Sequence, residues 1–117
     1  MEQHVDISHL SGYQTPAMAR YFVVFDGDNI EEIRAATKFA NEMKLPILTI
    51  AGGKNSLLAF DEYPGLIIYN ASEGYDVDTG RQMKVLSGQA IWDLAEVLEN
   101  EHGINLWHRF QGLPGSV

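Results

Sequence analysis

A chain of 117 residues with 45% hydrophobic residues has the size and apolar content of one folded unit with one core. Sixteen acidic and eight basic side chains give a net charge of -8, so nucleic acid and anionic membranes are not expected partners. The absence of cysteine excludes disulfides, thiolate metal sites and cysteine nucleophiles. With no signal-peptide pattern and no apolar run of about 20 residues, we expect a cytoplasmic protein.

Residues 1–14 are polar and show no hydrophobic periodicity. We expect a lead-in arm whose order depends on docking. His4 and His9 lie in this arm, but solvated histidines are commoner in such a segment than metal ligands. We assign them no role.

The next segment predicts a β-α-β unit. Residues 19–25 are rich in aromatic and β-branched side chains and end in a turn signal, which predicts a buried strand. An apolar stripe at three-and-four spacing predicts an amphipathic helix over residues 30–44. Residues 47–50 are almost wholly aliphatic, which predicts a short parallel strand covered on both faces. The segment after this strand then lies at the carboxyl end of the sheet, where α/β proteins bind ligands.

That segment, called the glycine loop below, is Ala51-Gly52-Gly53-Lys54-Asn55-Ser56. Its two glycines allow positive φ angles and a close approach of the backbone to a ligand, so the loop is suited to hold an anion. The spacing matches neither a P-loop nor the Gly-x-Gly-x-x-Gly dinucleotide motif. On these residues alone, a turn with glycines for geometry only is the commoner explanation, and both interpretations stay open.

The second half of the chain changes from a parallel to an antiparallel pattern. In chain order it predicts a turn, a short apolar strand, a β-hairpin and a second amphipathic helix, over residues 61–65, 66–69, 75–86 and 89–101. Gly103 is expected to end that helix in a left-handed conformation. The expected fold class is therefore mixed α/β: a parallel β-α-β unit, short strands, a hairpin and a second helix.

Several segments, in this order and at this separation, resemble a known family. They are Leu45–Leu58, Gly65–Tyr69, Leu86–Leu94 and the closing Gly112-Leu113-Pro114-Gly115-Ser116. They resemble the UDP-N-acetylenolpyruvoylglucosamine reductases, also called UDP-N-acetylmuramate dehydrogenases or MurB. This family belongs to the FAD-binding superfamily typified by vanillyl-alcohol oxidase and p-cresol methylhydroxylase. The likeness covers residues 15–117, which correspond to the front part of the family's length.

The resemblance implies an FAD site made of two loops, one of them lying against the FAD pyrophosphate through backbone amides. By match of position, the expected cofactor-binding residues are Ala51, Gly52, Gly53, Lys54, Asn55, Ser56, Gly112, Leu113, Pro114, Gly115 and Ser116. Ala51 stands where the family usually has glycine, which puts a positive φ at that position in doubt. Lys54 stands where the family usually has serine, and either adds a cation for the diphosphate or is simply solvated.

The resemblance also implies a function for the parent protein. It would be an FAD-dependent oxidoreductase that uses NADPH to reduce UDP-N-acetylglucosamine enolpyruvate in peptidoglycan synthesis and cell wall biogenesis. The family's catalytic residues fall after the closing segment, so we place no catalytic residue and no metal site on this chain. The partners would be FAD and, through the missing part, the UDP-sugar.

The domain organisation follows from the same resemblance. We expect a lead-in arm (1–14), a first FAD-binding subdomain (15–70) and the incomplete start of a second subdomain (71–117). Such a fragment is expected to be catalytically inactive alone and to self-associate through uncovered apolar surface. The alternative is a stand-alone acidic α/β interaction module that has lost flavin binding.

Overall fold

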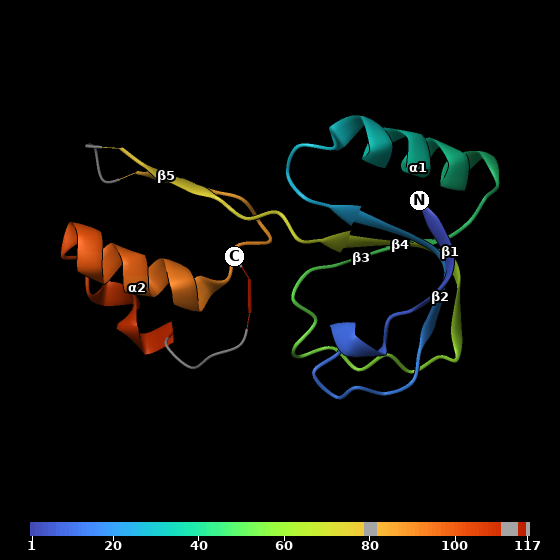
Figure 1. The fold of residues 1–117 in the computed structure, drawn as a ribbon, viewed down its shortest axis with the longest axis horizontal. Coiled ribbons are helices and arrows are strands. Elements are labelled where there is room, and N and C mark those ends of the chain that lie inside the picture. Colours follow the sequence, from blue (N-terminus) through green and yellow to red (C-terminus); the bar gives the residue numbers. More distant parts are fainter. Residues whose placement is uncertain (79–81, 111–114, 117) are drawn as a thin grey trace.

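The computed structural model describes residues 1–78, 82–110 and 115–116. In chain order its elements are β1 (Glu2–Asp6), η1 (Ser8–Leu10), β2 (Met18–Phe25), α1 (Ile30–Glu42), β3 (Ile47–Ile50), β4 (Glu62–Asn70), β5 (Tyr75–Val77), β6 (Met83–Val85), α2 (Ile91–His102) and η2 (Leu106–Phe110). They form two lobes, one reaching to the end of β4 and one starting at β5 (Figure 1). The radius of gyration is 16.4 Å, larger than the roughly 13 Å of a compact chain of this length. The predicted mixed α/β class is confirmed.

The first lobe is built on a four-stranded sheet with the strand order β1-β2-β4-β3. β4 lies between β2 and β3 and is parallel to both, so the two strands of the predicted β-α-β unit are parallel but not neighbours. Because all three strands run the same way, their carboxyl ends lie at one edge of the sheet, on the side of the second lobe (Figure 1).

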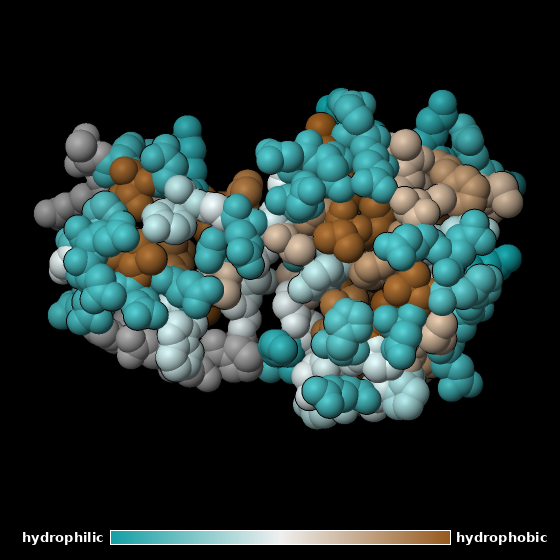
Figure 2. All heavy atoms as spheres, in the orientation of Figure 1, coloured by the Kyte–Doolittle hydropathy of each residue, from teal (hydrophilic) through white to brown (hydrophobic). Residues whose placement is uncertain are grey.

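Two hydrophobic clusters cover the two faces of this sheet. One lies against α1 and consists of Val23, Ala36, Ala40 and Leu66. The other lies on the opposite face and consists of Ile7, Leu10, Ala17, Ala19, Phe22, Leu58 and Ile67. On the face shown in Figure 2, hydrophobic residues are visible between α1 and the strands, with hydrophilic residues around them. Burial of both faces is the main stabilising contribution to the first lobe.

Residues 1–14, for which the sequence predicts an arm whose order depends on docking, form β1 and η1. β1 pairs antiparallel with β2, from Glu2 opposite Phe22 to Asp6 opposite Met18. Its side chains are mostly exposed, as suits an edge strand, and they therefore carry no hydrophobic alternation. The backbone ladder and the buried Ile7 hold the segment in place.

The expectation that both faces of residues 47–50 are covered is wrong. β3 is an edge strand, and Ile47 is 37% exposed. The cluster beneath α1 draws its strand residues from β2 and β4, and does not extend to Ile47. The strands with buried residues in both clusters are β2 and β4.

The predicted turn at residues 61–65 lies largely within β4, which begins at Glu62. The register with β2 is irregular between Ala19 and Tyr21, so the ladder accommodates Pro64, which lacks an amide hydrogen. A Cβ on Gly65 would lie 1.9 Å from the Pro46 carbonyl oxygen, so only glycine fits there. Pro64 and Gly65, which are typical turn residues, thus form a bulge in a central strand.

The second lobe agrees with the predicted hairpin and helix. β5 and β6 are antiparallel, with Tyr75 opposite Val85. α2 buries Leu94, Ala95 and Leu98 and ends at Gly103, whose φ of 64° is left-handed as predicted. Residues 104–110, which show no clean sequence period, contain the 3-10 helix η2.

A polar joint, made of Asn70, Ser72, Ser87 and Gly88, connects the lobes. The Asn70 side-chain amide donates to the Ser87 hydroxyl at 2.8 Å, and its oxygen accepts from the Ser72 hydroxyl at 2.7 Å. The Gly88 N–H donates to the Ser72 hydroxyl at 3.3 Å. A Cβ on Gly88 would lie 2.5 Å from the Ser72 carbonyl oxygen. The chain leaving β4 and the chain entering α2 are therefore joined by hydrogen bonds of side chains, and they approach so closely that only glycine fits at position 88.

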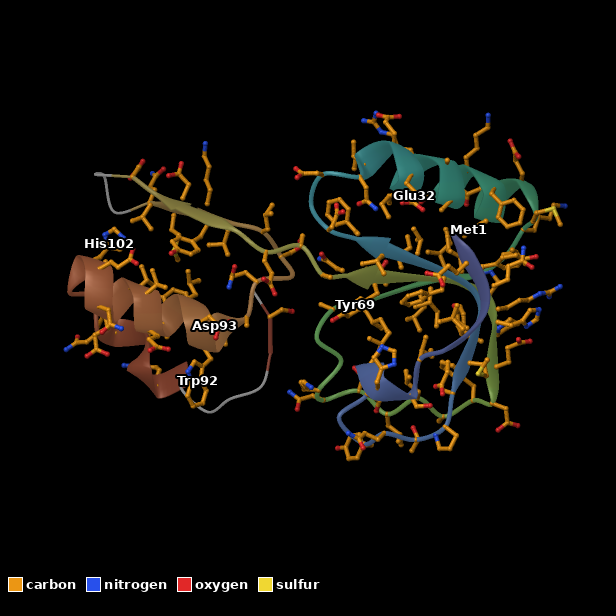
Figure 3. The ribbon with its side chains drawn as sticks, viewed as in Figure 1. Met1, Glu32, Tyr69, Trp92, Asp93 and His102 are labelled. Carbon is orange, nitrogen blue, oxygen red and sulfur yellow. The ribbon has the colours of Figure 1, made fainter. Side chains whose placement is uncertain are left out.

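Two carboxylates hold the start of α1. Asp26 accepts the N–H groups of Asp28 and Asn29, both at 3.0 Å, and these hydrogen bonds lower its pKa. Glu32 accepts from the Met1 ammonium at 2.8 Å, and this contact lowers its pKa as well (Figure 3). The N-terminus is thereby tied to the helix that covers the sheet.

Truncation of a central leucine should test the role of β4. Leu66 is fully buried, so Leu66→Ala should destabilise the fold by about 2–5 kcal/mol through lost burial and a cavity. The matched change Leu57→Ala, at a side chain that is 60% exposed, should change stability by no more than about 0.5 kcal/mol. Urea unfolding measures both, and equal losses would contradict the assigned core.

Candidate functional site

The candidate site is a hollow between the glycine loop and the end of the described chain. It has a volume of about 150 Å³ and is lined by Ala51, Gly52, Gly53, Lys54, Asn55, Ser56, Gly115 and Ser116. The structure thus brings the glycine loop together with two residues of the predicted closing segment. Gly112, Leu113 and Pro114 lie outside the described residues.

The two glycines of the loop have different roles. Gly53 has a φ of 61°, and a Cβ there would lie 1.8 Å from the Leu10 carbonyl oxygen, so its glycine is required by the fold. Gly52 has nothing within 4 Å of an added Cβ, so its glycine leaves open space. Ala51 is not among the described non-glycine residues with positive φ, which are His4, Gln14 and Lys44. Alanine is therefore compatible with the first position of the loop.

Backbone donors line the loop. The Gly53 carbonyl accepts the Ser56 N–H at 3.0 Å, which closes a tight turn. Within the part of the chain that the structure describes, the N–H groups of Gly52, Gly53 and Lys54 donate to no protein acceptor. Successive N–H groups at a turn form a concave, positively polarised surface suited to an anion. The exposed Lys54 ammonium adds positive charge to the same loop.

The closing segment is attached to the start of α2. The Ile91 N–H donates to the Gly115 carbonyl at 3.1 Å, and Ala90 forms an antiparallel bridge with Ser116. Because the joint connects the end of β4 to the chain that enters α2, it also fixes how far Gly115 and Ser116 lie from the glycine loop. The geometry of the hollow therefore depends on both lobes.

Sequence reasoning missed the residues that hold the glycine loop from the other side. The Ser11 hydroxyl donates to the Ser56 carbonyl at 2.6 Å, and the Gly12 N–H donates to the Gly53 carbonyl at 3.3 Å. The only sequence signal is a Ser-Gly pair inside a polar segment, which is common in loops. No local pattern indicates that this pair packs against residues more than forty positions away.

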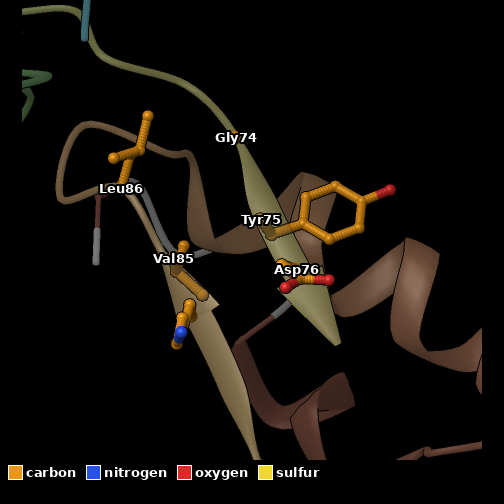
Figure 4. A pocket seen from close by; sticks show the side chains of 6 residues that line it. Gly74, Tyr75, Asp76, Val85 and Leu86 are labelled. Carbon is orange, nitrogen blue, oxygen red and sulfur yellow. The ribbon is translucent and has the colours of Figure 1, made fainter. Parts of the chain in front are cut away.

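A second hollow, of about 310 Å³, lies beside the hairpin and is lined by Gly74, Tyr75, Asp76, Lys84, Val85 and Leu86 (Figure 4). Asp76 and Lys84 are cross-strand partners, so their opposite charges offset each other. All its lining residues come from the hairpin and its two ends. We assign it no ligand.

Among the described residues, no group of three or more histidine, cysteine, aspartate and glutamate side chains is placed to bind a metal ion. No helix in this part of the chain is long and apolar enough to span a bilayer.

A mixed α/β fold with a backbone-lined hollow at the carboxyl edge of its parallel strands is typical of proteins that bind phosphorylated ligands. No protein-family model matches the chain. It is 27% identical, over its whole length, to the UDP-N-acetylenolpyruvoylglucosamine reductase of Chlamydia trachomatis serovar D and covers 39% of that protein. The corresponding figures are 26% identity and 38% coverage for the Acaryochloris marina enzyme. The Trichormus variabilis enzyme is 29% identical over 95% of the chain, with 33% of that enzyme covered.

These relatives confirm the resemblance that the sequence motifs suggested. The similarity extends over the arm as well as over the two loops, since it includes the whole chain for the first two enzymes. The chain spans less than two-fifths of the length of these relatives.

Alanine substitutions at Gly52 and Gly53 should differ in their effect on the stability of the fold. Gly53→Ala should destabilise the fold by about 2 kcal/mol or more, because it combines a positive φ with a backbone clash. Gly52→Ala meets open space and should cost no more than about 0.5 kcal/mol. Thermal or urea unfolding measures both, and a larger loss for Gly52→Ala would contradict the described loop geometry.

Proposed function

We propose that the chain is the FAD-binding part of a flavoprotein reductase similar to the UDP-N-acetylenolpyruvoylglucosamine reductases. The observation that carries the proposal is the hollow shared by the glycine loop and Gly115–Ser116. These segments lie far apart in the sequence, and they are the two that the resemblance assigns to FAD. The names of the relatives support the reductase part of the proposal.

The residues of the hollow fit the diphosphate part of FAD. A volume of about 150 Å³ suits a compact anion rather than a large aromatic ring. The chain has a net charge of -8, so long-range electrostatics oppose an anionic ligand. Binding must therefore rely on local donors, which are the N–H groups of Gly52 and Gly53, the Lys54 ammonium and the Ser116 hydroxyl.

The glycine loop and Ser116 contact the cofactor from two sides of the hollow. The glycine loop holds the diphosphate, and the open space at Gly52 admits its oxygens close to the backbone. Ser116, attached to the start of α2, lines the opposite wall. When bound, FAD supplies the redox chemistry, while the protein binds and orients it.

The proposal extends to the parent protein. It would use NADPH to reduce UDP-N-acetylglucosamine enolpyruvate for peptidoglycan synthesis in the cytoplasm, with the substrate held by residues outside this chain. An acidic interaction module without flavin is less well supported, because it gives no reason for two distant segments to line one hollow.

Filling the hollow should abolish cofactor binding without unfolding the protein. Gly52→Val places an isopropyl group in open space at the loop and should weaken FAD binding by at least about tenfold. Ala59→Val, at an exposed residue outside the hollow, is the matched control and should bind like the wild type. Titration of flavin fluorescence measures both. A wild-type chain that binds no FAD, or equal affinity in all three proteins, would contradict the proposed site.

The isolated chain should bind cofactor but not turn over substrate. It carries no candidate catalytic residue, so we expect no NADPH oxidation that depends on UDP-N-acetylglucosamine enolpyruvate, even with FAD in excess. Absorbance at 340 nm follows NADPH directly. Substrate-dependent oxidation above the rate of free FAD would show that this chain contains catalytic groups that the proposal does not assign.

A further inference from the structure

The glycine loop is packed against a second backbone segment, Leu10–Thr15, which we call the clamp segment. A Cβ on Gly53 would lie 1.8 Å from the carbonyl oxygen of Leu10, in the clamp segment. A Cβ on Gly12, in the clamp segment, would lie 2.1 Å from the carbonyl oxygen of Lys54, in the loop. Each segment thus approaches the backbone of the other so closely that only glycine fits.

Three hydrogen bonds join the clamp segment to the loop and its continuation. The Gly12 N–H donates to the Gly53 carbonyl at 3.3 Å. The Ser11 hydroxyl donates to the Ser56 carbonyl at 2.6 Å, and the Thr15 hydroxyl donates to the Leu58 carbonyl at 3.1 Å. These bonds hold the loop at its middle, at its end and just beyond it.

Ser11 is the central residue of this contact. It is 2% exposed, and its hydroxyl also accepts the Tyr13 N–H at 3.2 Å, which fixes the direction in which the hydroxyl donates. Ser11 does not line the hollow. Any effect of Ser11 on a ligand must therefore act through the loop.

We propose that Ser11 is a positioning residue of the cofactor site, and that the clamp segment sets the conformation of the glycine loop before a ligand binds. The N–H groups of Gly52 to Lys54 must point to one place to hold an anion together. A loop that is already ordered loses less conformational entropy when the ligand binds. Only the identity of the ligand, FAD, rests on the function proposed above.

The test compares Ser11→Ala with Ser8→Ala by amide hydrogen exchange in the absence of ligand. Ser8 lies in the same arm, but its hydroxyl bonds to Asp6 and Ala17 instead of the loop. Ser11→Ala should speed exchange at the Gly12 and Ser56 amides by about tenfold or more, while the Ile67 amide in β4 is unchanged. Ser8→Ala should leave the Gly12 and Ser56 amides unchanged.

The same variants are then titrated with FAD by flavin fluorescence. Ser11→Ala should raise the dissociation constant about tenfold, with the same signal at saturation. Ser8→Ala should bind like the wild type. Unchanged exchange at Ser56, or faster exchange with unchanged affinity, would overturn the proposal, as would equal acceleration at Ile67.

If Ser11→Ala does not fold, a pair of variants at Thr15 tests whether the clamp segment orders the glycine loop. Thr15→Val removes the hydroxyl at nearly constant shape and should speed exchange of the Ser56 amide, whereas Thr15→Ser keeps the hydroxyl and should restore the wild-type rate. Equal rates in the two variants would overturn the role of the clamp segment. A wild-type protein that binds no FAD contradicts the proposed function, and the exchange rates still decide whether the clamp segment orders the loop.

Discussion

The structure depends on the insertion of β4 between β2 and β3. β4 is parallel to both neighbours, and its adjacent residues Leu66 and Ile67 are fully buried in different hydrophobic clusters. It therefore joins the layer beneath α1 to the layer formed by the arm on the opposite face. β4 also ends at Asn70, the first residue of the joint, so the strand at the centre of the core leads directly into the second lobe.

The position of the candidate site follows from this arrangement. Parallel strands place their carboxyl ends at one edge, so the glycine loop after β3 and the joint after β4 both lie there. The joint positions α2, and α2 positions Gly115 and Ser116 opposite the loop. Within the loop, Gly53 meets a steric demand of the fold while Gly52 leaves room for a ligand. The steric restriction at Gly53 and the open space at Gly52 thus lie at adjacent residues.

Elements set by local pattern could be predicted from the sequence, as α1, the hairpin and the stop at Gly103 show. β1 could not, because its polar side chains are exposed and only its backbone pairing with β2 holds it. Pro64 and Gly65 were misassigned because the same residues suit a turn and a bulge.

For the site, family resemblance identified the two loops, whereas their shared hollow and the contact of Ser11 with Ser56 depend on the tertiary fold. Residues more than forty positions apart meet there, and no local pattern reports such a contact.

The central claim is that two distant segments hold one FAD molecule. It is tested most directly by following backbone amide resonances while FAD is added to the protein. The account predicts that the amides of Gly52 to Ser56 and those of Gly115 and Ser116 shift together, with one dissociation constant. Shifts confined to one segment, different dissociation constants for the two, or no shifts in either would contradict it.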